Sequence, residues 1–148
     1  MTHAHDVTEA TTGPQPRLRD CARTLLARAV EVVGQGWCRH EEALDGQARP
    51  CSAADDDAVQ WSAGGAIRRA ASDALSGLTP GLSGVSAARI SAAYGLAVEA
   101  AGRIADPQQR FAQAALRRWN DQQREVSRVQ GLFLAAAALL GERERKVA

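Results

Sequence analysis

Apolar residues recur at steps of three and four along most of the chain, which is the period of a helix with one buried face. The first stripe predicts a helix over residues 17–33, which the glycines just after it would end. A second stripe predicts a helix over residues 53–75, started by Ser52 and by Asp55 three positions later, a spacing typical of a capping box. A third predicts a helix over residues 85–104.

Two further helices are predicted from capping signals. Asp106 stands before a proline, and a carboxylate followed by proline is typical of a helix start, so we expect a helix over residues 107–118. Asn120, three residues before a glutamine, predicts the start of the last helix, which Gly141 would end.

The segments outside these stripes indicate the boundaries of the expected domain. Residues 37–51 show neither period clearly, and we interpret them as an ordered loop or a short hairpin. Residues 1–16 are polar and residues 142–148 are charged, so both are expected to be tails. The sequence therefore predicts an all-α fold: one bundle of about five helices over residues 17–141, with a long irregular connector between the first two.

Composition changes the picture of the core. Alanine occurs 31 times in 148 residues, so most apolar stripes are made of small side chains. We expect such helices to pack at close range, with Trp37, Trp61 and Trp119 supplying much of the bulk. Gly64 and Gly65 interrupt the second predicted helix, which suggests that another segment approaches its backbone there.

Charge and targeting signals narrow the function classes. The 18 basic and 17 acidic residues nearly cancel, which disfavours a nucleic-acid or membrane-surface partner. The start of the chain has no apolar run typical of an export signal, and residues 132–140, the longest apolar run, are too short to cross a bilayer. We expect a cytoplasmic protein whose three cysteines are free thiols.

Three motifs carry a family resemblance. They are Gly-Trp at Gly36, Val-x-Trp-x-x-x-Gly-Ala from Val59, and Trp-Asn-Asp from Trp119. With the apolar positions over residues 25–140, they resemble a family of small bacterial and phage proteins of unknown function. The resemblance implies a single helical domain and supplies no activity. Members of that family often carry Cys directly after the second Trp, where this chain has Ser62, so a role for that Cys does not carry over.

The sequence gives little support for a metal site or for a catalytic nucleophile. Cys38, His40 and Cys51 are ligand types that zinc prefers, but they lack the paired spacing of structural zinc sites, so we predict free thiols, no metal and no cofactor. The remaining histidines, His3 and His5, lie in the predicted tail. A nucleophile needs a base within reach, and the sequence shows no assembled pair of this kind, so we predict no catalytic residue.

Residues of the motifs and of the connector are the candidates for binding a ligand or partner. They are Trp37, Cys38, His40, Trp61, Trp119, Asn120 and Asp121. Structural roles compete with this interpretation, because tryptophan rings fill gaps between alanine-rich helices and Asn and Asp cap helices.

The leading hypothesis is a non-enzymatic helical module that acts through protein contacts, with a protein partner or with a second copy of itself. One alternative is a small enzyme or ligand-binding protein with a pocket near Trp37, His40 and Asp121. Another is a nucleic-acid-binding accessory protein. It is based on the arginine pairs at residues 68–69 and 117–118, on Arg124 and Arg128, and on the basic residues of the tail, Arg143, Arg145 and Lys146; interleaved acidic residues disfavour it.

Overall fold

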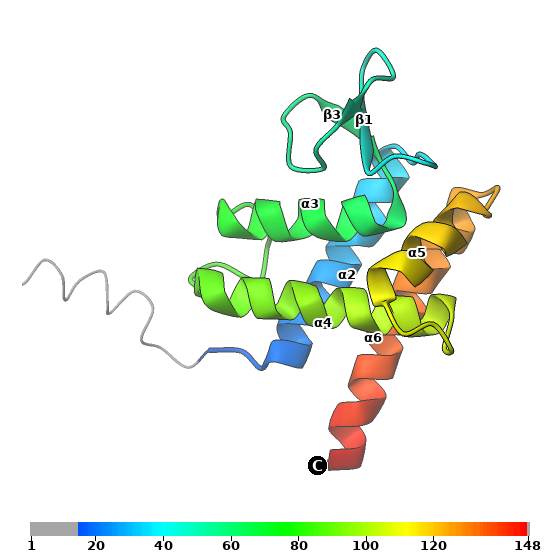
Figure 1. Cartoon of the computed structure of the whole chain (residues 1–148). Coiled ribbons are helices and arrows are strands. Elements are labelled where there is room, and N and C mark those ends of the chain that lie inside the picture. Colours follow the sequence, from blue (N-terminus) through cyan, green and yellow to red (C-terminus); the bar gives the residue numbers. More distant parts are fainter. Residues whose placement is uncertain (1–14, 148) are drawn as a thin grey trace, which may run out of the picture.

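The computed structural model describes residues 15–147, which form five helices and one small sheet (Figure 1). The helices are α2 (Leu18–Gln35), α3 (Ala63–Leu75), α4 (Ala87–Ala105), α5 (Ala112–Asp121) and α6 (Val126–Val147). The prediction of about five helices is confirmed. The prediction of an all-α fold is wrong, because the chain between α2 and α3 forms strands. Most of the tail predicted at residues 1–16, with His3 and His5, lies outside the described residues.

The sheet has three antiparallel strands in the order β2-β1-β3: β1 (Ala43–Asp45), β2 (Pro50–Cys51) and β3 (Ala58–Trp61). The Asp45 carboxylate closes the hairpin between β1 and β2, because its Oδ1 accepts the backbone N–H groups of Gln47 and Arg49, each at 2.9 Å. The connector is therefore a hairpin, one of the two forms predicted for it.

The helix predicted from residue 53 begins only at Ala63. The residues that suggested a capping box form turns, in which Ser52 Oγ accepts the N–H of Ala54 and Asp55 Oδ1 accepts the N–H of Asp57. Such local side-chain bonds offer the backbone an alternative to a helix. The helix is capped instead by Ser62, whose Oγ accepts the N–H of Gly65 at 3.0 Å.

The two residues predicted to start the last two helices, Asp106 and Asn120, do not cap them. Asp106 follows the end of α4, and its Oδ1 accepts the N–H of Gln108 at 3.1 Å in a turn that precedes α5. Asn120 lies in the last turn of α5 and is fully buried, so it does not cap α6. Both signals are short polar side chains whose oxygens can accept the N–H of a nearby or of a distant residue.

The last helix continues beyond its predicted end. α6 runs through Gly141 to Val147, and the Glu and Arg residues after the glycine are good helix formers. The apolar run at residues 132–140 lies in this helix, where Phe133 and Leu140 are fully buried and Leu134 is exposed. Among the described helices, none is both long and apolar enough to cross a membrane.

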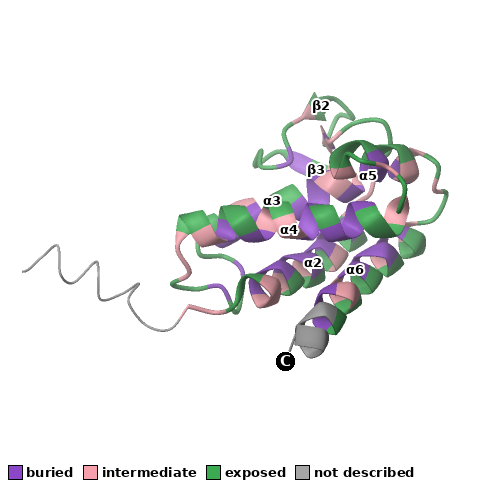
Figure 2. Cartoon of the chain, turned by 60° about the horizontal axis from the view of Figure 1, so that its bottom comes forward, coloured by how far each residue is buried: buried purple, intermediate pink, exposed green. Residues whose placement is uncertain are grey.

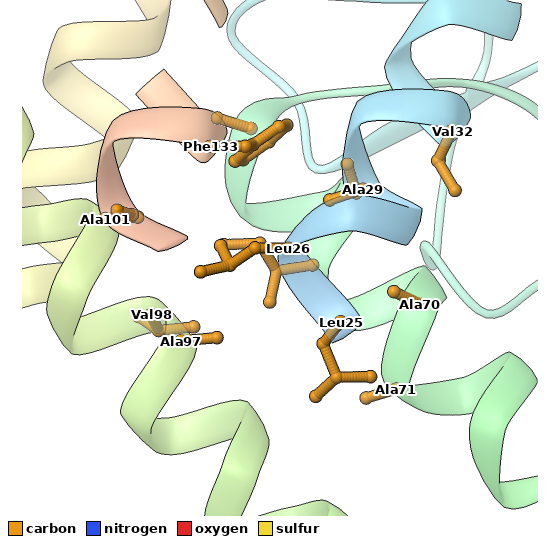
Figure 3. Close-up of a cluster of buried hydrophobic side chains, with 14 of the residues drawn as sticks. Leu25, Leu26, Ala29, Val32, Ala70, Ala71, Ala97, Val98, Ala101 and Phe133 are labelled. Atoms are coloured by element: carbon orange, nitrogen blue, oxygen red, sulfur yellow. The ribbon is translucent and has the colours of Figure 1, made fainter. Parts of the chain in front are cut away.

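The core lies around α2, which packs against α3, α4 and α6. Leu25, Leu26 and Phe133 are fully buried at its centre, among alanines of α2 and α4 (Figure 3). On α4 and α6, buried positions alternate with exposed ones around each helix (Figure 2). The tryptophans supply less of the bulk than predicted, because only Trp61 is fully inside, while Trp37 is half-buried at the core edge.

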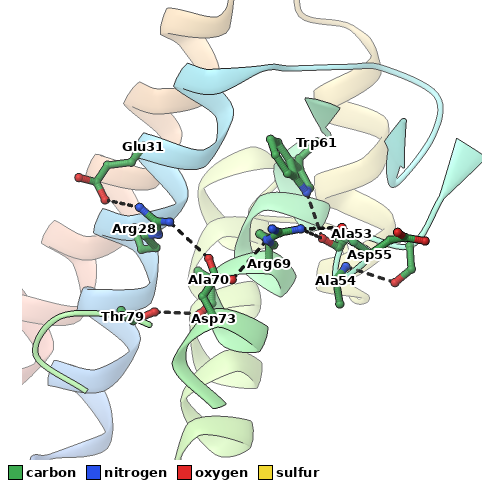
Figure 4. A network of polar contacts seen from close by, with 11 residues as sticks. Arg28, Glu31, Ala53, Ala54, Asp55, Trp61, Arg69, Ala70, Asp73 and Thr79 are labelled. Atoms are coloured by element: carbon green, nitrogen blue, oxygen red, sulfur yellow. Dashed lines mark hydrogen bonds and ion pairs between the residues drawn. The ribbon is translucent and has the colours of Figure 1, made fainter. Parts of the chain in front are cut away.

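A polar network joins α2, α3 and the loop before β3 (Figure 4). The buried carboxylate of Asp73 lies 3.4 Å from Arg28 Nη2 and 3.3 Å from Arg69 Nε. Arg69 also donates to the backbone carbonyl of Asp55 at 2.8 Å, and its guanidinium stacks over the Trp61 ring. The network holds the sheet against α3, which fixes one side of the site described below.

Candidate functional site

The side chain of Asn120 connects three separate parts of the chain. Its Oδ1 accepts the indole N–H of Trp37 at 2.8 Å and the backbone N–H of Ala63 at 2.9 Å. Its Nδ2 donates to the carbonyl of Cys38 at 3.2 Å. Ala63 is the first residue of α3, so Asn120 satisfies an amide that a helix start leaves without an intrahelical partner. The end of α5 is thereby fixed to the start of α3 and to the segment after α2.

The neighbouring carboxylate, Asp121, holds His40. Asp121 Oδ1 accepts the backbone N–H of His40 at 2.7 Å, and Asp121 Oδ2 lies 3.5 Å from His40 Nδ1. His40 has a φ of 75°, in the left-handed region that side chains other than glycine rarely adopt. Such a conformation persists only where surrounding contacts determine it, and it is typical of functional sites. The imidazole itself is exposed.

Glu42 fixes the segment on the other side of His40. Its Oε2 accepts the N–H of Ala53 at 2.6 Å and its Oε1 lies 3.0 Å from Arg68 Nη1. Its backbone carbonyl approaches α3 so closely that a Cβ added at Gly65 would lie 2.1 Å from the oxygen. The close approach expected at the glycine pair is confirmed for Gly65, and its partner is the segment just before β1.

These elements surround a cavity of about 390 Å³ between the start of α3, α4 and α5. His40, Asp121 and Arg68 lie on its rim with Arg117, and Tyr94 forms part of its wall. Burial raises the pKa of the Tyr94 phenol, so its hydroxyl stays protonated and can donate a hydrogen bond. The cavity combines hydrogen-bonding groups with an apolar wall, as ligand sites do.

Among the charged groups that line the cavity, Arg117 and Glu41 have no ion pair with the described residues. Arg68 is paired with Glu42, and His40 lies against Asp121. The described part of the chain contains no ion-pair partner for Arg117, which is exposed on α5. Its guanidinium is therefore available for an anionic group of a ligand.

A second cavity of about 810 Å³ lies along α4. Tyr94, Val98 and Gln113 line both cavities, so the two adjoin between α4 and α5. The second cavity is also lined by Phe111, whose side chain is 67% exposed. We call this surface, from His40 to Phe111, the α4–α5 groove.

The structure brings most of the predicted candidates together. Trp37, Cys38, His40, Asn120 and Asp121 meet at one junction, and His40 and Asp121 line the cavity. The remaining two candidates have structural positions.

Trp61 is buried in the core and donates its indole N–H to the carbonyl of Ala53 at 3.1 Å, while Trp119 is half-buried against the core. Tyr94 was not among the predicted binding residues, and Arg117 was considered only as part of an arginine pair that could bind nucleic acid. A signal for Arg117 existed, because Gln113, Arg117 and Asp121 recur at steps of four, which places them on one face of a helix.

The three residues weighed as zinc ligands do not form a metal site. Within the described residues, no group of three or more His, Cys, Asp or Glu side chains could hold a metal ion. Cys38 is buried with its Sγ 3.6 Å from the carbonyl of Glu41, and burial raises the pKa of its thiol to about 11. The thiol is therefore protonated at neutral pH, which also makes it a poor nucleophile.

Comparison with known proteins gives a family but no function. No curated protein and no solved structure matches the chain. One family model matches residues 11–139, a range that contains the Asn120 junction, the cavity and the groove. The chain therefore belongs to this family, described as a family of unknown function (DUF6197).

Proposed function

We propose that the protein is a non-enzymatic binding module that holds a ligand or partner in the cavity beside His40 and Arg117. One observation carries this proposal: Asp121 holds His40 in a left-handed conformation at the rim of a cavity, and Arg117 on the same rim has no ion-pair partner among the described residues. Backbone strain next to an uncompensated cation is typical of a preorganised binding site.

The hydroxyl and thiol groups near the cavity support a binding role over catalysis. Ser62 Oγ donates to the carbonyl of Glu42 and accepts the N–H of Gly65, so it is committed to capping α3. Cys38 is held protonated by burial. A nucleophile needs a base within hydrogen-bond reach, and neither group bonds to His40.

A small enzyme is the second candidate, and one observation favours it. The carboxylate of Asp121 lies against His40 Nδ1, as in sites where a carboxylate orients a general base. A screen for hydrolysis of nitrophenyl esters and phosphoesters tests this candidate. Activity that is lost in His40→Ala would establish it and would contradict the non-enzymatic proposal.

Nucleic acid is the weaker choice of partner. Of the arginines that suggested it, Arg68 is paired with Glu42 and Arg69 with Asp73, so the arginine pair on α3 is neutralised within the chain. Phosphate binding would favour a concentrated and unpaired basic face. We therefore propose a protein partner or a second copy of the chain, and light scattering of the purified protein tests the second.

Three free thiols support a reducing compartment. Cys21 and Cys38 are buried and Cys51 is half-buried, and all three are unpaired. We accordingly place the module in the cytoplasm of its host.

An amide-resolved NMR titration tests the binding proposal. The probes are citrate, inorganic phosphate and a capped peptide rich in glutamate. Saturable shifts at the amides of His40, Gly65 and Arg117 are expected, because these residues line the cavity. Arg117→Glu should abolish them and Arg118→Glu, an exposed neighbour that does not line the cavity, should not. Absence of saturable shifts at these amides with every probe would overturn the proposal.

A further inference from the structure

One face of α6 is exposed along the middle of the helix. The helix lies at the outer edge of the bundle, where its buried side packs on α2 and α4 (Figure 2). Steps of three and four separate the exposed positions, so they form one continuous surface along the helix. Between Arg128 and Glu142 these positions are Gly131, Leu134, Ala135 and Ala138.

This outward face of α6 is apolar. No residue from 129 to 141 carries a charge, although the solvent side of a helix is usually polar or charged. Leu134 leaves 60% of its surface exposed. Gly131 has nothing within 4 Å of an added Cβ, so no contact within the described chain requires a glycine there, although glycine weakens a helix. The face therefore fits a partner that covers Leu134 and approaches the helix closely at Gly131.

Opposite charges close the two ends of this face. Arg128 and Glu142 are 14 positions apart, which is close to four helical turns, so both lie on the same side of the helix. Both are exposed, and neither forms an ion pair with another described residue. Ala135 lies midway between them, so the face has equal lengths and opposite charges on the two sides of this residue.

This pattern of charges matches a second copy of the same helix in antiparallel orientation. In a two-fold contact, a residue i of one copy meets a residue j of the other copy, and j meets i. With Ala135 at the two-fold axis, Arg128 of each copy lies opposite the partner's Glu142, about 10 Å along the helix from the axis. A parallel arrangement would instead bring the two copies of Arg128 together, and such like-charge contacts are unfavourable.

We propose that the protein forms an antiparallel dimer through the outward face of α6, centred on Ala135 and joined at each end by an ion pair between Arg128 and the partner's Glu142. This inference goes beyond the proposed binding function, because none of the described residues of α6 lines either cavity. The dimer interface and the cavities are separate surfaces of the molecule.

Sedimentation equilibrium of the full chain, from about 5 μM to about 500 μM, tests the dimer; this range suits the weak association expected of a small interface. The variants are Arg128→Glu, Glu142→Arg, the double variant with both changes, and Ala135→Arg. The matched controls are Arg118→Glu and Ala92→Arg, which make the same changes at exposed positions of α5 and α4.

Every substituted position is exposed, and glutamate and arginine are good helix formers, so each variant should keep the fold. Circular dichroism checks this before sedimentation.

We expect the wild type to dimerise reversibly. Each single charge reversal brings like charges together and should raise the dissociation constant of the dimer by about tenfold or more. The double variant exchanges the two charges and should return to within about threefold of the wild type, as for directly coupled residues. Ala135→Arg should give a monomer at every concentration, and the two controls should dimerise as the wild type does.

A wild type that stays monomeric at every concentration overturns the inference. So does a dimer that Ala135→Arg leaves intact, or a double variant that dimerises no more tightly than the single ones. None of these results bears on ligand binding in the cavity, because the NMR titration tests that separately. An absence of shifts in the titration would contradict the binding function and leave the dimer standing.

Discussion

The indole N–H of Trp37 donates a hydrogen bond of 2.8 Å to Oδ1 of Asn120, a residue 83 positions further along the chain. The same oxygen accepts the N–H of Ala63, so one buried amide side chain satisfies donors from two other elements. Because Asn120 precedes Asp121, this bond also sets the position of the carboxylate that holds His40. The stability of the fold and the geometry of the cavity therefore depend on the same junction.

Replacement of Asn120 by alanine should destabilise the protein strongly. The N–H groups of Trp37 and Ala63 would lose their acceptor, and an unsatisfied buried donor costs about 1–3 kcal/mol. Urea unfolding followed by circular dichroism measures the loss. Trp37→Phe removes a single donor and leaves the bond to Ala63, so it should cost less than Asn120→Ala. Equal stability of Asn120→Ala and the wild type would contradict the role given to this side chain.

Two glycine-to-alanine substitutions should change the stability of the protein in opposite directions. A Cβ at Gly65 would lie 2.1 Å from the carbonyl oxygen of Glu42, so the backbone must shift, and such overpacking costs about 1–3 kcal/mol or more. Gly95 is an exposed position inside α4 with nothing within 4 Å of an added Cβ. Gly95→Ala should therefore stabilise the protein by about 0.5–1 kcal/mol. Thermal unfolding of both variants checks the pair, and a loss of similar size in both would be evidence against the close approach.

Trp61 and Trp119 should differ in their contribution to stability. Trp61 is 4% exposed and its indole N–H is bonded, so Trp61→Ala should cost about 3–5 kcal/mol, as for other large buried aromatics. Trp119 is half-buried against the core, and Trp119→Ala should cost clearly less. Chemical denaturation of the two variants measures the difference. A larger loss for Trp119 would show that the packing is assigned wrongly.

The buried thiol of Cys38 should make stability fall in alkaline solution. Burial raises its pKa to about 11, whereas the ordinary value is 9.0. The contribution of this thiol to the free energy of unfolding is intact below pH 9 and is lost as the pH rises to 11. Between these values the thiol ionises in the unfolded chain but keeps its proton in the folded one. A pKa difference of about two corresponds to about 2–3 kcal/mol.

The comparison that isolates this thiol is Cys38→Ala. Burial also raises the pKa values of Tyr94 and Cys51, so the wild type loses stability from several groups in this range. Urea unfolding at pH 8 and at pH 10.5 should show a smaller alkaline loss in Cys38→Ala than in the wild type. Parallel losses in the two proteins would rule out an ionisation linked to Cys38.

The sequence predicted the helices whose apolar stripe is long and regular. The stripes of α2 and α4 are regular over five turns or so, and the predicted and observed helices there differ by a residue or two at each end. Strand β3 was missed because only four residues form it, too few for a period of two to stand out from the stripe of α3. Its place is set by pairing with β1 and by the bond from Trp61 to Ala53, both of which depend on tertiary contacts.

The site was predicted only in part, because its contacts join residues that are far apart in the sequence. The motifs indicated Trp37, Asn120 and Asp121 as unusual residues, and the structure brings them together. Their roles could not be predicted from the sequence. Asn120 accepts the N–H of Ala63, the first residue of α3, which lies 57 positions away. Sequence patterns report neighbours within a turn or two, whereas Arg117 becomes notable only once its lack of an ion-pair partner among the described residues is known.

Asp121→Ala offers the most direct test of the link between the junction and the cavity. In the NMR titration with citrate, phosphate and peptide, we predict that the saturable shifts at the amides of Gly65 and Arg117 disappear in this variant, because His40 loses the carboxylate that holds it. The indole resonance of Trp37 should remain in place, since Asn120 is unchanged, which shows that the fold persists. Unaltered shifts at Gly65 and Arg117 in Asp121→Ala would contradict the account.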